Sequence, residues 1–216
     1  MNQLLKLLFP PKCILCGRPL PGEEEICPDC RQKVLLNTTP PRTEKGAFFD
    51  RAAAGLWYQG AVRQAIHGLK YREKQSYARP LARVMLYAYQ TKIGEECDLI
   101  AFVPTNPSTL RQRGYDQARL LAEALAGLLE LPCVPALEKT RETGRMAGLK
   151  PDQRWANVLG AFRVCCSPEL LRGRRVLLVD DILTTGSTLS ECARMLKAAG
   201  AEAVFGLCAA AVGKTS

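Results

Sequence analysis

Short apolar segments alternate along the chain with segments whose apolar residues recur at helical spacing. A continuous apolar run is typical of a strand buried on both faces of a parallel sheet, and recurrence every three to four residues is typical of an amphipathic helix. The predicted strands lie at residues 52–60, 97–103, 133–134, 176–179 and 203–211. The predicted helices lie at residues 61–69, 118–129 and 187–199, with one more beginning near Pro80. This alternation predicts an α/β fold with an open, mostly parallel twisted sheet.

The stretch at residues 176–191, VLLVDDILTTGSTLSE, combines a predicted strand with candidate chemistry. Two carboxylates, Asp180 and Asp181, follow the apolar run, and a helix is expected from Ser187 after a loop of small residues. The first turn of a helix has unpaired backbone N–H groups and a partial positive charge, so it binds anions. Hydroxyl donors and a glycine that permits close backbone approach gather at this turn: Thr184, Thr185, Gly186, Ser187 and Thr188.

Carboxylates beside a phosphate would repel it, so Asp180 and Asp181 must serve another part of a ligand. An acidic pair at the carboxyl end of a strand suits the two hydroxyls of a ribose, with Mg²⁺ nearby. The stretch therefore indicates a site for a phosphorylated pentose. The alternative interpretation is an ordinary strand-to-helix turn with a good N-cap.

The same stretch closely resembles the phosphoribosyl pyrophosphate (PRPP) motif of type I phosphoribosyltransferases, with four hydrophobic residues, two acids, an aliphatic residue and then TTGST. The resemblance implies that Asp180 and Asp181 are the catalytic pair that holds the ribose 2′- and 3′-hydroxyls. It implies that residues 184–188 cradle the 5′-phosphate. Arg111 and Arg113, in the loop after the strand at residues 97–103, would then lie on the pyrophosphate side, where arginine suits paired phosphate oxygens.

Four of the ten cysteines form two CxxC units separated by ten residues: Cys13, Cys16, Cys27 and Cys30. Each unit places two thiolates on one tight turn, and two such turns can close a tetrahedral shell around Zn²⁺. Because four cysteines leave no open coordination position, we expect a structural zinc; a redox CxxC unit is the alternative. The predicted organisation is an N-terminal helix and Cys₄ zinc module at residues 1–36, a linker at residues 37–47 and a phosphoribosyltransferase-like domain at residues 48–216.

Composition limits the classes of protein that this chain can belong to. With 216 residues, 47% of them hydrophobic and 24% charged, it has the composition of a globular protein with a sizeable core. No apolar run approaches the 18 residues needed to span a membrane, and the start, MNQLLKLLFPP, is too short and too soon broken by proline for a signal peptide. The remaining cysteines are scattered, which favours a reducing compartment, so we expect a cytoplasmic protein.

The basic charge suggests a class of partner, and one long polar segment suggests a further functional element. The net charge of +9 favours polyanionic partners, either nucleic acid or a pyrophosphorylated substrate. Residues 138–154 are polar and basic; they are either a lid that excludes water during transfer from PRPP or a solvated surface loop. His67 is the only histidine, so the sequence supports no Ser-His or Cys-His catalytic arrangement.

Taken with the paired CxxC units, further stretches resemble the ComF family along nearly the whole chain, a family that includes competence protein ComFC and GntX-like proteins. These stretches are LLFP, HGLKYRE, RQRGYDQA, RWANVLGAFRV and VLLVDDILTTGSTL. Two positions depart from the family: the RGYDQ loop usually reads RGFNQ, and Met146 stands where Gln is common. The resemblance implies a role in DNA uptake during natural transformation, or a related task, with single-stranded DNA and uptake proteins such as a ComFA-like helicase as partners.

Three functions therefore stay open. The chain is a phosphoribosyltransferase that uses PRPP and Mg²⁺, a non-catalytic component of the uptake machinery that binds single-stranded DNA and proteins, or a nucleotide-sensing regulator. A transferase would depend on positioning and charge stabilisation rather than a protein nucleophile. Aromatic residues make up only 6% of the chain, which is few for a surface on which bases stack.

Overall fold

A computed structural model describes residues 11–22, 25–33, 47–69, 72–144 and 151–213. In chain order its elements are α2 (Pro28–Lys33), β1 (Arg51–Trp57), α3 (Gly60–Gly68), η1 (Arg72–Tyr77), α4 (Ala78–Ala88), η2 (Tyr89–Ile93), β2 (Leu99–Phe102), α5 (Pro107–Arg113), α6 (Gln117–Leu129), β3 (Leu137–Lys139), α7 (Pro151–Val158), β4 (Phe162–Val164), η3 (Pro168–Leu170), β5 (Arg175–Leu183), α8 (Ser187–Ala198) and β6 (Ala203–Ala211). The predicted N-terminal helix and most of the predicted linker fall outside the described residues.

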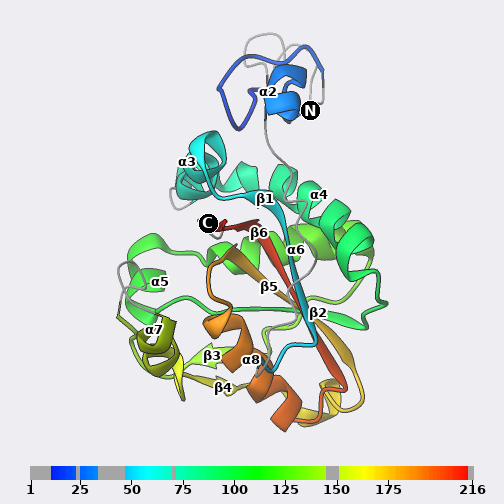
Figure 1. Ribbon diagram of the computed structural model, residues 1–216, viewed down its shortest axis with the longest axis vertical. Coiled ribbons are helices and arrows are strands. Elements are labelled where there is room, and N and C mark those ends of the chain that lie inside the picture. The colour runs from blue at the N-terminus through cyan, green and yellow to red at the C-terminus, as the bar shows by residue number, and fades with distance from the viewer. Residues whose placement is uncertain (1–10, 23–24, 34–46, 70–71, 145–150, 214–216) are drawn as a thin grey trace.

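Four strands form one parallel sheet in the order β1-β6-β5-β2, so the expected α/β fold with a mostly parallel sheet is confirmed (Figure 1). β5 lies inside the sheet, with β6 on one side and β2 on the other. Since all four strands run the same way, their carboxyl ends lie along one edge, where ligands bind in open α/β sheets. A separate antiparallel pair, β3 and β4, lies beside α7 and α8.

Helices cover both faces of the sheet, which explains why its strands are apolar throughout. In β5, Leu177 and Val179 pack into the layer that contains α4 and α6, whereas Val176 and Leu178 pack against α8. All four side chains are fully buried. At Gly55 in β1, an added Cβ would lie only 2.8 Å from Cγ1 of Val84, so glycine allows α4 to approach the sheet closely.

Two expected loop assignments were wrong in detail. Residues 107–113, expected in a loop, form helix α5, with Pro107 at its start and Gly114 at φ +80° at its end. Proline suits the first helical turn because that N–H has no intrahelical partner, and glycine tolerates the left-handed end. The segment at residues 138–154 also contains regular structure at its two ends, since β3 extends to Lys139 and α7 begins at Pro151. Residues 145–150, in its middle, lie outside the described residues.

The brief strand expected at residues 133–134 is only an isolated bridge between Cys133 and Ile100. Pro132 and Pro135 flank it, and proline has no N–H with which to extend a ladder. β5, by contrast, extends further than its apolar run, because β6 pairs with it as far as Leu183. Asp180 and Asp181 therefore lie within the strand rather than after it.

The cysteine module packs on the side of the main domain that carries α4 (Figure 1). Oε2 of Glu25 lies 3.2 Å from Nη1 of Arg83 in α4. Ile14 and Leu20 are buried in the same apolar cluster as side chains of α4. Among the described residues, no helix has the length and apolar character that crossing a membrane requires.

Candidate functional site

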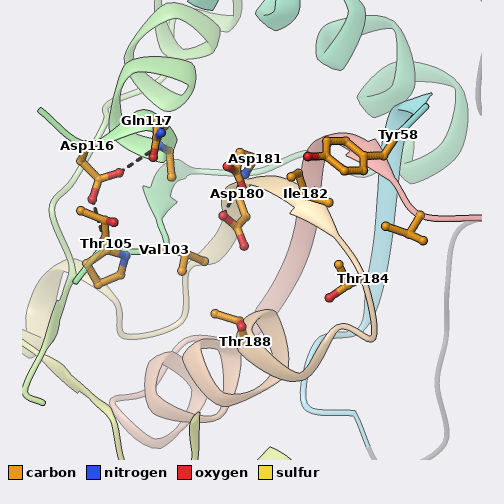
Figure 2. A pocket seen from close by; sticks show the side chains of 13 residues that line it. Tyr58, Val103, Thr105, Asp116, Gln117, Asp180, Asp181, Ile182, Thr184 and Thr188 are labelled. Atoms are coloured by element: carbon orange, nitrogen blue, oxygen red, sulfur yellow. Dashed lines mark hydrogen bonds between the residues drawn. The ribbon is translucent and has the colours of Figure 1, made fainter. Parts of the chain in front are cut away.

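A cavity of about 350 Å³ lies at the carboxyl edge of the sheet, where β2 and β5 end and α6 begins (Figure 2). Its walls come from segments far apart in the sequence: Tyr58, Val103, Pro104, Thr105, Asp116, Gln117, Ala118, Asp180, Asp181, Ile182, Thr184, Thr188 and Val212. Four of the predicted site residues are therefore brought together here, namely Asp180, Asp181, Thr184 and Thr188.

The acidic pair lies at the centre of this wall, with Thr184 and Thr188 on one side and the start of α6 on the other (Figure 2). The backbone N–H of Asp181 donates to Oδ1 of Asp180 over 2.8 Å. Burial raises the pKa of the Asp180 carboxyl, and the neighbouring charges of Asp181 and Asp116 raise it further. None of the described residues that line this cavity is a lysine or an arginine, so the cavity favours a ligand that brings hydroxyl donors or a cation.

The segment after β5 turns tightly into α8. Gly186 precedes the helix with φ +81°, a left-handed conformation that glycine adopts without strain. Thr184 and Thr188 line the cavity, whereas Ser187 is buried at 2% exposure and its hydroxyl lies 3.0 Å from that of Thr185. The start of α8 and two of the four predicted hydroxyl groups therefore border the cavity, while the other two hydroxyls bond to each other within the turn.

Asp116 is a wall residue that the sequence interpretation missed. Its side chain caps α6 by accepting the N–H groups of Ala118, at 2.9 Å, and Arg119, at 3.3 Å. Its other oxygen accepts the N–H of Thr105 at 2.7 Å, which ties the segment after β2 to α6. Burial raises the pKa of this carboxyl although its backbone donors lower it. An aspartate two positions before the helical pattern at residues 118–129 is an N-cap signal that could have identified it.

Arg111 and Arg113 lie in the last turn of α5, and neither lines this cavity. The opposite end of α5 contacts the start of the predicted lid, because the N–H of Ser108 donates to Glu142 over 2.9 Å. The positive charge of Arg111 helps to lower the pKa of Glu142, after the stronger effect of the Ser108 hydrogen bonds. The described start of this segment, residues 138–144, therefore contacts the first turn of α5.

A second cavity, of about 520 Å³, shares Pro104, Thr105 and Asp116 with the first. Lys139 of β3 lines it, with its Nζ 5.1 Å from the centre of the Phe162 ring. Burial lowers the pKa of this lysine, and the charge of Asp180 opposes that effect. The residues between the two cavities are therefore Pro104, Thr105 and Asp116, and the hydrogen bond from Thr105 to Asp116 fixes their arrangement.

The four predicted zinc ligands meet in the N-terminal module. The sulfur atoms of Cys13, Cys16, Cys27 and Cys30 all lie within 4.8 Å of one another. Burial raises the pKa of the Cys13 thiol, but backbone N–H donors, that of Cys27 first, outweigh burial and lower the pKa to about 6. Burial, followed by hydrogen bonds with the other sulfur atoms, raises the pKa of Cys30 to about 12, so this thiol would lose its proton as a metal binds. Four cysteine sulfur atoms at this spacing, with Cys13 already favoured as the thiolate, fit zinc.

Comparisons with known proteins agree with both parts of this architecture. Residues 4–44 match the double zinc ribbon domain, and residues 116–215 match the phosphoribosyl transferase domain. DNA utilization protein YhgH of Escherichia coli is 30% identical over 200 residues, covering 89% of this chain and 86% of the relative. Competence protein F of Haemophilus influenzae is 30% identical over 204 residues, covering 90% and 82%.

The chain belongs to the ComF family. The expected combination of a cysteine module and a type I phosphoribosyltransferase domain is thereby confirmed. The zinc ribbon match and the cysteine cluster together support a structural zinc in this ComF-family protein.

Similar solved structures include phosphoribosyltransferases. Adenine phosphoribosyltransferase from Thermoanaerobacter pseudethanolicus has 17% identity and a TM-score of 0.41, covering 82% of this chain and 84% of that chain. Glutamine PRPP amidotransferase from B. subtilis has 25% identity and a TM-score of 0.42, covering 62% and 26%.

Proposed function

We propose that this ComF-family protein binds PRPP, or a related ribose 5-phosphate ligand, together with Mg²⁺. The observation that carries the proposal is the cavity at the carboxyl edge of the sheet, which gathers Asp180, Asp181, Thr184 and Thr188 around one space of about 350 Å³. Acids and hydroxyls at the end of a central parallel strand, followed by a helix N-terminus, suit the sugar and the phosphate of one ligand.

Each part of the ligand has a partner in this arrangement. The hydroxyls of Thr184 and Thr188 and the start of α8 would bind the 5′-phosphate. Asp180 and Asp181 would accept hydrogen bonds from the ribose hydroxyls. Burial first, and then repulsion from Asp181 and Asp116, raises the pKa of Asp180. The repulsion supports a divalent cation in the bound state, because Mg²⁺ would offset the excess negative charge of the carboxylates and of the pyrophosphate.

The reaction that suits such a site is phosphoribosyl transfer. The bond from C1 to the pyrophosphate oxygen breaks with its electron pair on the leaving group, and a nitrogen nucleophile forms the new bond to C1 and loses a proton. Arg111 and Arg113, in the last turn of α5, would attract the pyrophosphate.

The test is calorimetric titration of the purified chain with PRPP, with and without Mg²⁺. We expect Mg²⁺-dependent binding in the micromolar range, about −8 kcal/mol. The double variant Asp180→Asn/Asp181→Asn should lose it. Glu202→Gln is the matched control, because Glu202 is exposed and precedes β6 at the opposite edge of the sheet. Unchanged PRPP binding in the double variant would sink the assignment.

A second candidate function is supported by the names of the relatives, DNA utilization protein YhgH and competence protein F. In this proposal the protein acts in the cytoplasm during DNA uptake and contacts single-stranded DNA or uptake proteins. The net charge of +9 supports an anionic partner. DNA affinity should then fall steeply as salt rises, because bound lysines and arginines release counterions. A salt-independent signal, or none, would count against this function.

A further inference from the structure

Gln117 is a buried polar residue whose amide nitrogen has no partner. It is the first residue of α6, and only 6% of it is exposed. Within the part of the chain that the structure describes, its Nε2 makes no hydrogen bond. Buried polar groups are nearly always paired, because leaving a donor unsatisfied destabilises the fold. We therefore expect a functional role for the Gln117 amide.

The side chain of Gln117 belongs to the wall of the 350 Å³ cavity. Its backbone position is held firmly, since Asp116 directly before it caps α6 and binds the N–H of Thr105. Figure 2 shows Gln117 at the α6 side of the cavity and Thr184 and Thr188 at the far side, with the two acids of β5 between them. The amide is therefore built into the site at a fixed distance from the acidic pair.

The amide also supplies a neutral hydrogen-bond donor beside three carboxyl groups. The neighbouring polar side chains that line the cavity include the carboxylates Asp116, Asp180 and Asp181, which accept hydrogen bonds when ionised. A half-turn of the terminal amide exchanges its nitrogen and oxygen, so the donor can face the cavity when a ligand offers an acceptor. A ligand oxygen at this end would meet a neutral donor in place of another negative charge.

We propose that Gln117 contacts the ligand and determines specificity at the C1 end of the ribose. This inference rests on the proposed function, in which the 5′-phosphate lies by Thr184 and Thr188 and the ribose hydroxyls by the acids. C1 then points toward α6. The Gln117 amide donates a hydrogen bond to an oxygen of the group on C1, which in PRPP is the pyrophosphate. In the ligand-free protein the same amide stays unsatisfied, at a cost to stability.

The test compares Gln117→Met, which keeps the length of the side chain but removes the amide, with Gln64→Met at an exposed position of α3. Both are titrated with PRPP and with ribose 5-phosphate in the presence of Mg²⁺, and both are melted without ligand. We expect Gln117→Met to bind PRPP about tenfold more weakly, since one hydrogen bond is lost, and to bind ribose 5-phosphate as the wild type does. Its ligand-free Tm should rise, because the unpaired donor is gone.

A residue with a merely structural role would behave in the opposite way, with a lower Tm and unchanged PRPP affinity, and that result would overturn the proposal. An equal loss for ribose 5-phosphate would also overturn it, because the contact would then be to the sugar. If Gln117→Met does not fold, Gln117→Glu takes its place, and its carboxylate should weaken PRPP binding by more than tenfold. Absence of PRPP binding by the wild type would refute the proposed function and this assignment together; wild-type binding that Gln117 variants leave intact would refute this assignment alone.

Discussion

The three hydrogen bonds of Asp116 allow its contribution to stability to be separated into two parts. One carboxylate oxygen caps α6, and the other holds the N–H of Thr105 in the segment after β2. Asp116→Ala removes both interactions. Asp116→Asn has one carbonyl oxygen, so it can keep the cap, but it turns an NH₂ group toward the N–H of Thr105 and loses that bond.

The expected magnitudes follow from these contacts. Loss of an N-cap costs about 1 kcal/mol. Loss of a part-buried bond to a charged acceptor costs about 1.5 kcal/mol. Asp116→Ala should therefore lower the free energy of unfolding by about 2.5 kcal/mol, and Asp116→Asn by about 1.5 kcal/mol. These are upper values, because burial of the carboxylate, which raises its pKa, opposes folding of the wild type.

The assay is thermal unfolding at pH 7, followed by circular dichroism. For a chain of 216 residues each kcal/mol corresponds to about 2–4 °C in Tm, so Asp116→Ala should melt about 5–10 °C below the wild type. Glu202→Ala, at an exposed position before β6, should change the Tm by less than about 2 °C. Equal losses of Tm for the Ala and Asn variants would show that the Thr105 bond carries all the stabilisation. That result would refute a separate contribution from the N-cap.

Three further predictions concern other parts of the molecule. Cys27→Ser should lower the bound zinc below one equivalent by metal analysis, since the cluster loses a ligand; full zinc content would contradict the Cys₄ site. Asp180→Asn should raise the ligand-free Tm at pH 7 by on the order of 2–4 °C. Because folding raises the pKa of Asp180, its charge destabilises the fold above about pH 4, so the advantage of the variant should disappear as the pH falls to that value. Glu191 is fully buried and bonds to Arg194 and to the N–H of Gly160, both over 2.8 Å, and its pKa is lowered, first by Arg194. Glu191→Gln should therefore cost about 2 kcal/mol at neutral pH. That difference should shrink as the pH falls below about 4.3 and through the lowered pKa of Glu191; a constant difference in pH-dependent melting would contradict the ionic interpretation.

The sequence alone was sufficient for the elements whose pattern is local. The apolar runs at β5 and β6, the helical spacing of α6 and α8, and the two CxxC units each depend on residues within about a dozen positions. Burial on both faces requires a continuous apolar strand, and one amphipathic face requires helical spacing, so these patterns could be read directly. The stretch from Val176 to Glu191 identified both the central strand and half of the polar wall of the cavity.

Where the pattern of apolar residues is weak, the local sequence led to a wrong prediction of secondary structure. Residues 107–113 have few apolar side chains to reveal a helix, yet Pro107 and Gly114 define its ends. The end of β5 could not be predicted from its apolar run, because Asp180 and Asp181 stay in the strand only through pairing with β6. Strand ends depend on the neighbouring strand, which a single segment does not contain.

Only the tertiary structure decided which residues share the cavity with the acidic pair. Asp116 and Gln117 lie more than 60 positions before Asp180, and Tyr58 lies a further 58 positions before Asp116. They meet because the strand order β1-β6-β5-β2 brings the carboxyl ends of β1, β2 and β5 to one edge. The sequence determined the chemistry of the single stretch that carries the acids and hydroxyls. Long-range strand pairing decided that Gln117, whose buried Nε2 has no partner among the described residues, lines the same cavity. The residues near Gln117 in the sequence carry no information about which side chains will lie opposite it.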